Sequence, residues 1–371
     1  MLTHSKALLK KTLVYLLVLC LLLLSACGKK PAYPTDSVSS SEATEQESTE
    51  QTTADAETSE ETETSIEASV FPMTVTDQAG REVTFEQAPE KIVSGYYISS
   101  SALIALGVQS KLVGIEAKAD KRNIYKLSAP ELCELPSVGS AKEFDLEGCA
   151  ALKPDLAILP LKLKDAADTL TELGIKVLLV NPENMELMEN MLKLLGNVTD
   201  RSEQAENICG FIRETEDQLN KLSGEKPVVY MSSNSSLLAT AGKNMFQADM
   251  IRLAGGKNAA DEIEDTYWAD ISYEQLVSWN PDVILLAAEA AFTVDDVLND
   301  PALSDVTAVK NKQVYAMPDK AEAWDSPVPG AILGSVYLAS LLHEDELTEK
   351  ECTEITDSFY EEFYGFTYSE K

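Results

Sequence analysis

Aromatic, cationic and amide side chains follow several short apolar runs of this sequence, where they could together hold a small molecule. Aromatic rings pack against flat or macrocyclic ligands, and Lys side chains pair with carboxylate or catecholate oxygens. A site with largely apolar walls and few polar groups suits a bulky, partly anionic ligand. The aromatic members lead this set. The candidates are Tyr96, Tyr97, Ser99, Lys118, Lys142, Asn234, Lys243, Tyr267, Trp268 and Trp324.

Each candidate also has a purely structural interpretation. Tyr97 suits a hydrophobic core, and Trp268 suits packing between two parts of the fold. The neighbouring cations Lys121 and Arg122 suit a solvated surface pair. We therefore expect roughly half of the candidates to contact a ligand.

The chain has few histidines that could support catalysis or metal binding. Its two His residues are His4, near the N-terminus, and His343, at the end of an expected helix over 333–342. One His beside acidic residues suits a helix terminus better than a catalytic triad or a His-rich zinc site. No nucleophile elbow, phosphate-binding glycine loop or HExxH is present. The sequence favours a binding protein over an enzyme.

The elements that would position the candidates alternate between strands and helices. Alternation of this kind predicts parallel sheets with helices on both faces, and ligands of such sheets lie beyond the carboxyl ends of the strands. The expected strands are 91–97, 112–116, 156–160, 176–181, 228–232, 283–287 and 313–317, and the expected helices include 99–106, 146–152 and 166–173.

A repeat links the two halves. Residues 145–159 align without a gap on residues 272–286, and each copy runs from a capping residue through a two-turn helix and a Pro-Asp break to an apolar strand. Each copy carries an acid two residues after its cap, Glu147 or Glu274. Between the copies, 202–222 has amphipathic spacing over about 30 Å of helix. The expected parts are an N-terminal lobe over 71–200, a linking helix over 201–224 and a C-terminal lobe over 225–371.

The N-terminus reads as an export signal rather than as part of the fold. A basic start, an apolar run from Leu13 to Leu24 and the sequence Leu-Ser-Ala before Cys27 resemble a bacterial lipoprotein signal. The resemblance implies a signal peptide over 1–26 and lipid on the sulfur of Cys27, and so an extracytoplasmic protein anchored to the outer face of the membrane. Residues 27–70 are rich in Ser, Thr and Glu and predict a disordered acidic tether.

Charge and cysteine content narrow the class further. A formal net charge of −32 excludes a nucleic-acid partner, which needs a basic surface. Cys133, Cys149, Cys209 and Cys352 lack CxxC spacing, which argues against a zinc cluster. Export permits disulfides, but we favour buried free thiols.

The order of short motifs resembles one family. The segments 75–83, 91–94, 112–115, 152–156, 253–256 and 272–276 are similar to those of the periplasmic binding proteins that serve iron–siderophore, heme and cobalamin importers. No single motif decides the resemblance, but their order covers about Phe71 to Tyr364. It implies two Rossmann-like lobes joined by one long helix, with the ligand in the cleft between them and no cofactor.

The resemblance gives the repeated acids a role. Members of that family dock on an ABC permease dimer, with its ATPase, through one Glu on each lobe, and Glu147 and Glu274 occupy the matching positions. The competing interpretation is that each acid only stabilises a helix N-terminus, by about 0.3–1 kcal/mol. An iron–siderophore complex is the first expected ligand, followed by cobalamin or another corrinoid, heme, and an oxyanion such as molybdate. Two alternative functions lie outside the class of solute-binding proteins: a metallocluster or chelatase-like enzyme, and a surface adhesion module.

Overall fold

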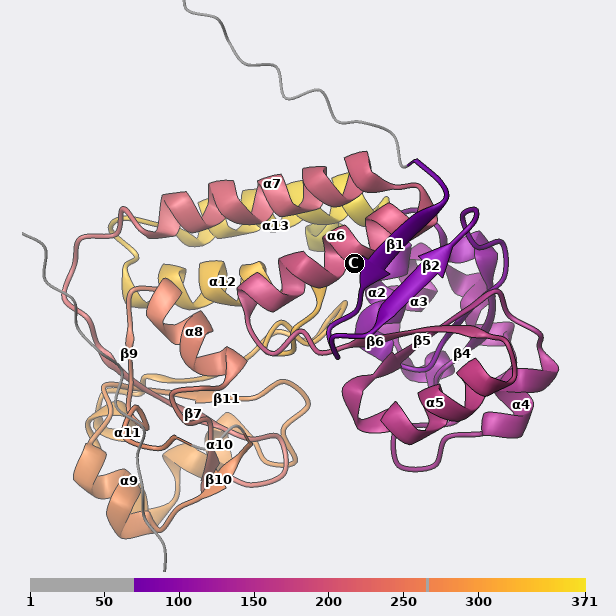
Figure 1. Cartoon of the computed structure of the whole chain (residues 1–371). Coiled ribbons are helices and arrows are strands. Elements are labelled where there is room, and N and C mark those ends of the chain that lie inside the picture. Colours follow the sequence, from indigo (N-terminus) through magenta and orange to yellow (C-terminus); the bar gives the residue numbers. More distant parts are fainter. Residues whose placement is uncertain (1–69, 265–266) are drawn as a thin grey trace, which may run out of the picture. The chain divides into compact units, whose positions relative to one another are not determined.

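The computed structural model describes residues 70–264 and 267–371 (Figure 1). The expected signal peptide over 1–26, the lipidation site at Cys27 and tether residues 27–69 lie outside the described residues. Among the described residues, no helix combines the length and the hydropathy needed to cross a membrane.

The first lobe is built on a four-stranded parallel sheet in the order β4-β3-β5-β6. All five residues of β5 are buried, as expected for an aliphatic run in a parallel sheet that is covered on both faces. The elements are β3 (Ile92–Ser94), α2 (Tyr97–Ala105), β4 (Leu112–Ile115), α3 (Asn123–Ser128), α4 (Leu146–Ala151), β5 (Leu156–Pro160), α5 (Lys164–Glu172), β6 (Lys176–Val180) and α6 (Met185–Thr199).

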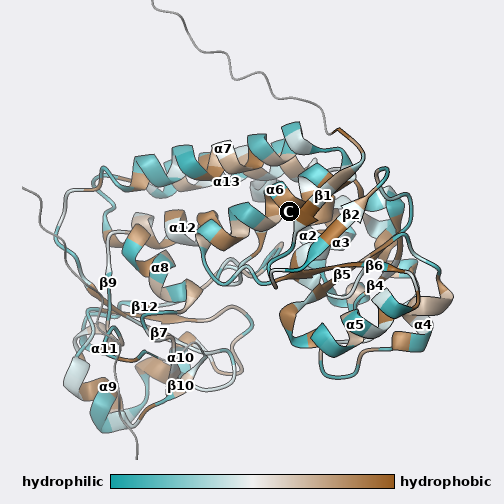
Figure 2. Ribbon diagram, in the orientation of Figure 1, coloured by the Kyte–Doolittle hydropathy of each residue, from teal (hydrophilic) through white to brown (hydrophobic). Residues whose placement is uncertain are grey.

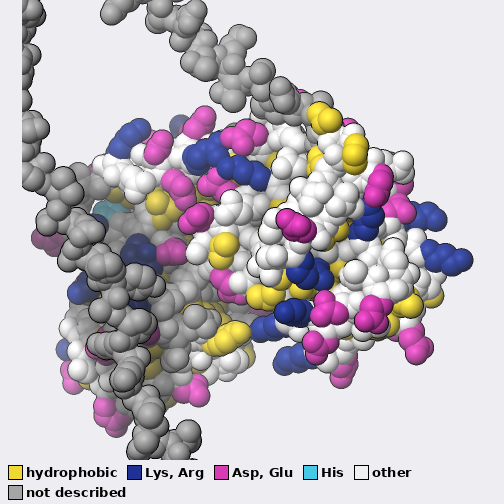
Figure 3. Space-filling model, viewed as in Figure 1, with side chains coloured by type: hydrophobic (Ala, Val, Ile, Leu, Met, Phe, Trp, Pro, Cys, Tyr) yellow, Lys and Arg dark blue, Asp and Glu magenta, His cyan; other side chains and the backbone are white. Residues whose placement is uncertain are grey.

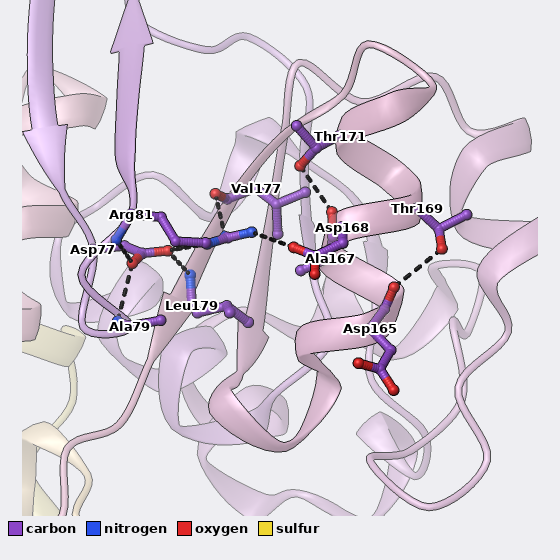
Figure 4. Close-up of polar contacts among 10 residues, drawn as sticks. All are labelled: Asp77, Ala79, Arg81, Asp165, Ala167, Asp168, Thr169, Thr171, Val177 and Leu179. Carbon is purple, nitrogen blue, oxygen red and sulfur yellow. Dashed lines mark hydrogen bonds and ion pairs between the residues drawn. The ribbon is translucent and has the colours of Figure 1, made fainter.

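An antiparallel hairpin of β1 (Met73–Thr76) and β2 (Glu82–Phe85) precedes this sheet. The buried carboxylate of Asp77 accepts hydrogen bonds from the backbone N–H groups of Ala79 and Arg81 within the turn, and from that of Leu179 on β6 (Figure 4). The Arg81 side chain donates to this carboxylate and to the carbonyl of Val177. The hairpin is therefore fastened to the edge strand of the sheet.

The second lobe has a mixed sheet in the order β10-β8-β7-β11-β12, with β9 also paired to β7. Strands β7, β9, β11 and β12 run parallel, and β8 is antiparallel to both of its neighbours, β7 and β10. The elements are β7 (Val228–Ser232), β8 (Ala239–Thr240), α8 (Phe246–Leu253), β9 (Lys257–Asn258), β10 (Ala269–Asp270), α9 (Tyr273–Trp279), β11 (Val283–Leu286), α10 (Val294–Leu298), α11 (Thr307–Lys310) and β12 (Val314–Ala316).

Helix α7 (Ser202–Leu219) links the two lobes, as predicted. It buries a stripe that includes Ala205, Ile208 and Ile212, and its hydrophilic residues lie between these apolar positions, as the alternating colours in Figure 2 show. The stripe packs on α6 and on α12 (Ile332–Leu342). One continuous hydrophobic core, extending from the sheet of the first lobe to that of the second, runs beneath these helices.

The C-terminal helix α13 (Glu349–Tyr364) returns to the first lobe and packs against α2 as well as against α12. Phe211 of α7 meets Phe359 and Phe363 of α13 edge-on, at centroid distances of 5.3 and 5.9 Å. The tyrosine hydroxyl of Tyr364 lies 2.8 Å from Oγ of Ser101. The prediction of a single bridging helix was therefore incomplete, because α13 forms a second bridge and α6 completes the helical layer.

The four cysteines of the described part are free thiols, as favoured from the sequence. Cys149, Cys209 and Cys352 are buried, and Cys133 is partly buried. Burial raises the pKa of the Cys149 thiol to about 11 and that of Cys209 to about 12, so both are neutral and unreactive at physiological pH. His343 caps the C-terminus of α12 and is buried, which agrees with its predicted helix-end position.

Candidate functional site

A cavity of about 320 Å³ lies between the two lobes. Its walls come from loops and helix starts that follow the strands of each sheet, where ligands of α/β folds are expected. From the first lobe they are Tyr97, Ser101, Lys121, Arg122, Asn123, Ile124 and Tyr125, and from the second Asn234, Gln247, Trp268, Ala287, Ala288, Glu289, Asp319, Glu322, Ala323, Asp325, Ser326 and Val328.

The wall of the first lobe is aromatic and cationic. Tyr97 begins α2, directly after β3, and Arg122 immediately precedes α3. The guanidinium carbon of Arg122 lies 4.2 Å from the centroid of the Tyr97 ring, which is a cation–π contact. Lys121 is exposed beside it and pairs with Asp120 at 3.0 Å. This wall therefore offers positive charge held against an aromatic ring.

The wall of the second lobe is mostly acidic and polar. Asn234 follows β7, Gln247 projects from the first turn of α8, and Trp268 precedes β10. Glu289, after β11, has the positive backbone φ of 57°, a conformation that non-glycine residues adopt at a cost. Strain of this kind is often found at binding sites.

Two buried carboxyls, Glu322 and Asp325, lie in the cavity wall after β12. Burial raises the pKa of Glu322 to about 7 and that of Asp325 to about 6, although both carboxyls accept hydrogen bonds. Oδ2 of Asp325 accepts from the backbone N–H of Ala288 at 3.1 Å. Near neutral pH, a substantial fraction of Glu322 is therefore uncharged.

Hydrogen bonds join the lobes at the base of the cavity. The Ser101 hydroxyl of the first lobe donates to Oε2 of Glu322 at 2.8 Å, and within the second half of the chain the Tyr360 hydroxyl donates to Oε1 of the same carboxyl at 3.3 Å. Asn123 of α3 donates to the carbonyl of Lys320 at 3.2 Å. A hydrogen bond from Ser326 lowers the pKa of Tyr97, although burial raises it more. The base of the cavity is consequently a built interface between the lobes.

A third carboxyl, Glu116, lies behind the cationic wall. It accepts from Ser100 Oγ at 2.6 Å and from the Tyr125 hydroxyl at 2.7 Å. Burial raises the pKa of Glu116, and the charge of Arg122 lowers it by a smaller amount. Glu116 thus orients Tyr125 rather than facing a ligand.

The described residues contain no group of three or more His, Cys, Asp or Glu side chains that could hold a metal ion. The cavity has a cationic side, an acidic side and aromatic walls, and it suits a compact organic ligand or a complexed metal better than a bare ion.

Comparison with known proteins fits this geometry. A family model described as periplasmic binding protein matches residues 92–321, which is more than half of the chain. The chain belongs to the periplasmic binding protein family. It is a solute-binding component of ABC transport and not an enzyme, and proteins of this kind bind a transported ligand rather than a cofactor.

Three members of the family illustrate the similarity. The molybdate-binding protein MolA of Haemophilus influenzae is 24% identical over 79% of this chain and 91% of its own length. The uncharacterized ABC transporter substrate-binding lipoprotein YvrC of Bacillus subtilis is 26% identical over 76% of this chain and 88% of its own length. A crystal structure of a periplasmic solute binding protein from Veillonella parvula superimposes with a TM-score of 0.69, at 27% identity, over 80% of this chain and 93% of that one.

The ligands named for similar proteins and structures differ widely. Besides molybdate, they include cobalamin, heme and nickel with histidine. Family membership therefore gives this chain its role in transport but leaves the chemistry of its ligand to the cavity itself.

Three of the ten ligand-contact candidates line the cavity of this periplasmic binding protein: Tyr97, Asn234 and Trp268. Each follows a strand end or precedes the repeated helix, as the sequence argument required. Tyr96 does not line the cavity; it is half-buried next to Tyr97, with ring centroids 5.5 Å apart.

The leading candidate Trp324 packs away from the cavity. Its side chain is 2% exposed, and its indole N–H donates to the Tyr360 hydroxyl at 2.8 Å. It also packs on Tyr337 and Tyr368, so it belongs to the core under α12 and α13. The sequence placed it correctly after β12 but could not show that the ring points to the opposite side of that loop.

The remaining five candidates also lie outside the cavity lining. Ser99 is fully buried and bonds Ser94 and the carbonyl of Tyr96. Lys118 and Lys142 are exposed in loops, and Lys243 pairs with Glu264 at 2.5 Å. Tyr267 is 65% exposed, and Nζ of Lys162, from the first lobe, lies 5.1 Å from the centroid of its ring.

Sequence reasoning missed Ser101, Tyr125 and Gln247 as parts of the cavity wall. All three lie within helices, whereas the search followed loops. Gln247 is in the first turn of α8, and polar residues in first turns near strand ends were the available signal. Arg122 lay in an inspected loop but was interpreted as surface.

The repeated acids lie on different lobes. Glu147 is in the first turn of α4. The preceding N-cap residue, Asp145, accepts a hydrogen bond from the backbone N–H of Gly148 at 2.8 Å. Glu274 is in the first turn of α9. Its N-cap residue, Ser272, accepts a hydrogen bond from the backbone N–H of Gln275 at 3.2 Å. Both acids are exposed, and neither forms an ion pair with a residue that the structure describes. Figure 3 shows basic and acidic side chains interspersed over one face of the molecule.

Proposed function

We propose that this protein captures a metal chelate outside the cell and delivers it to an ABC permease. Among the possible chelates, we propose an iron–siderophore complex as the first choice. The observation that carries the proposal is the cavity between the lobes, where Arg122 is held on the Tyr97 ring opposite Trp268. A cation on an aromatic surface suits the oxygen-rich, partly anionic shell of such a chelate.

Three other ligands of the class fit the cavity less well. Molybdate carries only negative charge, and Glu289, Asp319, Glu322 and Asp325 line the same cavity. Heme would need a tyrosinate as axial ligand, but burial raises the pKa of Tyr97, and Tyr125 is bonded to Glu116. A corrinoid suits the aromatic walls, but it is the bulkiest of the ligands considered, and a cavity of about 320 Å³ is at the small end of the range for small-molecule sites.

Delivery to the permease would use Glu147 and Glu274. Two exposed acids at equivalent positions of two lobes suit a partner with two-fold symmetry, and charges at an interface orient association. A helix-terminus role, which lowers the pKa of Glu274 through its backbone and Ser272, is compatible with docking.

Lipid attachment at Cys27 would hold the protein at the outer face of the membrane. The supporting observations are the Leu24–Cys27 sequence and the lipoprotein in the name of the relative from Bacillus subtilis. Incorporation of radiolabelled palmitate into the wild-type chain, but not into Cys27→Ala, would be the expected result. Equal labelling of the two would rule out this site.

The deciding experiment for the ligand is mass spectrometry of the protein purified from its native host. The expected result is a co-purified iron–siderophore complex, confirmed by titration of the ligand-free protein with that complex. Recovery of a corrinoid, heme or molybdate instead would overturn the first choice of ligand.

A further inference from the structure

A second cavity, of about 510 Å³, lies outside the cleft and is larger than the one between the lobes. It is called the outer cavity below. Its walls come from helices α12 and α13, which pack side by side (Figure 1), from β12 and the residue after it, and from the C-terminal residues Tyr368 and Ser369. Its volume is within the range of sites that hold small molecules.

The loop after β12 separates the two cavities. Pro318 and Trp324 line the outer cavity, whereas Asp319, Ala323 and Asp325 of the same loop line the cavity between the lobes. No residue lines both cavities. The outer cavity is therefore a separate site, and ligand capture in the cleft does not account for it.

Aromatic rings form the inner surface of the outer cavity. The buried Trp324 ring is its floor: Tyr337 meets this ring edge-on, with centroids 6.4 Å apart, and Tyr368 packs on it at 5.1 Å. The Trp324 indole N–H donates to the Tyr360 hydroxyl at 2.8 Å, which holds the floor in place. Tyr315 and Tyr337 are only half-buried, so a ligand can reach their side chains.

The charged residues that line the outer cavity are all acidic. Glu344, after α12, and Glu349, at the start of α13, are exposed, and neither forms an ion pair with a residue that the structure describes. Burial raises the pKa of Tyr337 to about 12, and the charge of Glu349 contributes, so this acid lies close to the rings. The nearby Lys320 is outside the lining and donates to the backbone carbonyl of Tyr368 at 3.1 Å.

This combination selects one class of ligand. The faces of aromatic rings attract organic cations, and two unpaired acids at the same cavity attract the same sign of charge. An anion would meet repulsion from Glu344 and Glu349, with no Lys or Arg in the lining to offset it.

We propose that the outer cavity is a second binding site, and that it holds a small aromatic molecule carrying a protonated amine. The aromatic part packs on Tyr315 and Tyr337 above Trp324, and the ammonium group lies towards Glu344 and Glu349. This inference goes beyond the proposed function and does not depend on which ligand occupies the cleft.

The test titrates the full chain, purified in detergent, with three indoles of different charge. Tryptamine carries a protonated amine, 3-methylindole is neutral, and indole-3-propionate carries a carboxylate. By isothermal titration calorimetry we expect tryptamine to bind about 10-fold more tightly than 3-methylindole, as a partly desolvated cation–π contact would give. Indole-3-propionate should bind most weakly, and high salt should reduce the preference for tryptamine, because the acids are exposed.

Four variants locate the bound indole. The double variant Glu344→Gln/Glu349→Gln should reduce the preference for tryptamine to about 2-fold and leave the affinity for 3-methylindole unchanged. Thr353→Trp, at an exposed position that lines the cavity, should block all three indoles. Ser358→Trp, exposed on the same helix but outside the lining, should bind them as the wild type does. Trp268→Ala, in the cleft, should also leave tryptamine binding unchanged.

The Thr353→Trp variant also corrects for detergent, because any heat that it still gives comes from indole in the micelles. Circular dichroism spectra and thermal midpoints identify any variant that fails to fold. If Trp268→Ala abolishes tryptamine binding and Thr353→Trp does not, the amine occupies the cleft and the outer site is wrong. Equal affinity for tryptamine and indole-3-propionate, or no binding of any indole, would also overturn the inference.

A second copy of the chain is the competing occupant of the outer cavity. Sedimentation velocity should show a monomer, and a concentration-dependent dimer that Thr353→Trp disrupts would overturn the small-molecule site. The proposed function fails separately: a protein that binds tryptamine in the outer cavity but captures no chelate would contradict only the proposed function.

Discussion

The two lobes share a layered plan and a repeated helix, but their cleft walls differ in charge. The first lobe contributes Lys121 and Arg122, and the second contributes Glu289, Asp319, Glu322 and Asp325. The first turns of α4 and α9, called the tips of the lobes below, in contrast present equivalent exposed acids, Glu147 and Glu274. Similar exteriors with opposite interiors suggest that a symmetric partner contacts the tips while an asymmetric ligand occupies the cleft.

The largest expected effect tests the equivalence of the tips. Reversing both Glu147 and Glu274 to Lys should reduce ligand uptake to background, because like charges facing each other across an interface cost several kcal/mol. Ligand affinity should not change, since both residues lie outside the cavity. Uptake of labelled ligand by cells and titration of the purified protein measure the two quantities.

The single variants provide the control for this prediction. If the tips are equivalent, Glu147→Lys and Glu274→Lys should impair uptake to a similar degree. Normal uptake by the double variant would rule out docking through these acids and leave them the role of stabilising their helices.

The next largest effect separates two tryptophans of the second lobe. Trp324→Ala should lower the free energy of unfolding by about 3–5 kcal/mol, because it removes a buried indole and its hydrogen bond to Tyr360. Trp268→Ala should cost less stability and should instead weaken ligand binding, since Trp268 is only partly buried and lines the cavity. Urea unfolding and ligand titration of both variants test the contrast. The opposite pattern, with binding lost only in Trp324→Ala, would show that the cavity was assigned to the wrong ring.

A third prediction concerns Glu322, the second-lobe carboxyl that accepts a hydrogen bond from Ser101 of the first lobe. Burial raises its pKa from the ordinary 4.5 to about 7, so the folded state holds the proton more tightly than the unfolded state. The resulting stabilisation is fully present below about pH 4.5 and is lost as the pH rises through about 7. As the pH rises across this range, the free energy of unfolding of the wild type should therefore fall by on the order of 3 kcal/mol relative to that of Glu322→Gln, which has no carboxyl to titrate at this position.

The measurement for this third prediction is urea unfolding of both proteins at pH 5 and pH 8. Asp325 also has a raised pKa, but it is present in both proteins and cancels in the difference. Parallel pH dependence of the two proteins would show that Glu322 is ionised throughout.

The fold was predictable because its strands are recognisable in the sequence. The runs at β5 and β7 were predicted to the residue, and the remaining predicted strands were recovered with shorter ends. Helices α6 and α13 were not predicted, although α13 begins with a capping box at Thr348 and Glu351. Their contribution depends on packing between distant segments, which periodicity alone does not reveal.

The site was less predictable than the fold, because strand ends locate loops but not side-chain directions. Trp268 and Trp324 both occupy suitable loops, yet only Trp268 lines the cavity. Gln247 and Tyr125 contribute from helices, and Arg122 looked like a surface cation until Tyr97 was seen beneath it. Which side of a loop a residue faces depends on the other lobe, and no local pattern encodes that.

The return of α13 to α2 has a practical consequence for protein engineering. Ser128 Oγ donates a hydrogen bond to the carbonyl of Tyr364 at 2.6 Å, and Ser101 forms a hydrogen bond with the hydroxyl of the same residue. These contacts attach the end of α13 to the N-terminal half of the molecule. Cutting the gene at the linking helix would leave an N-terminal fragment with an uncovered apolar face. A split reporter or shortened version should instead keep residues 349–364 with the first half, either by circular permutation or by supplying them as a separate peptide.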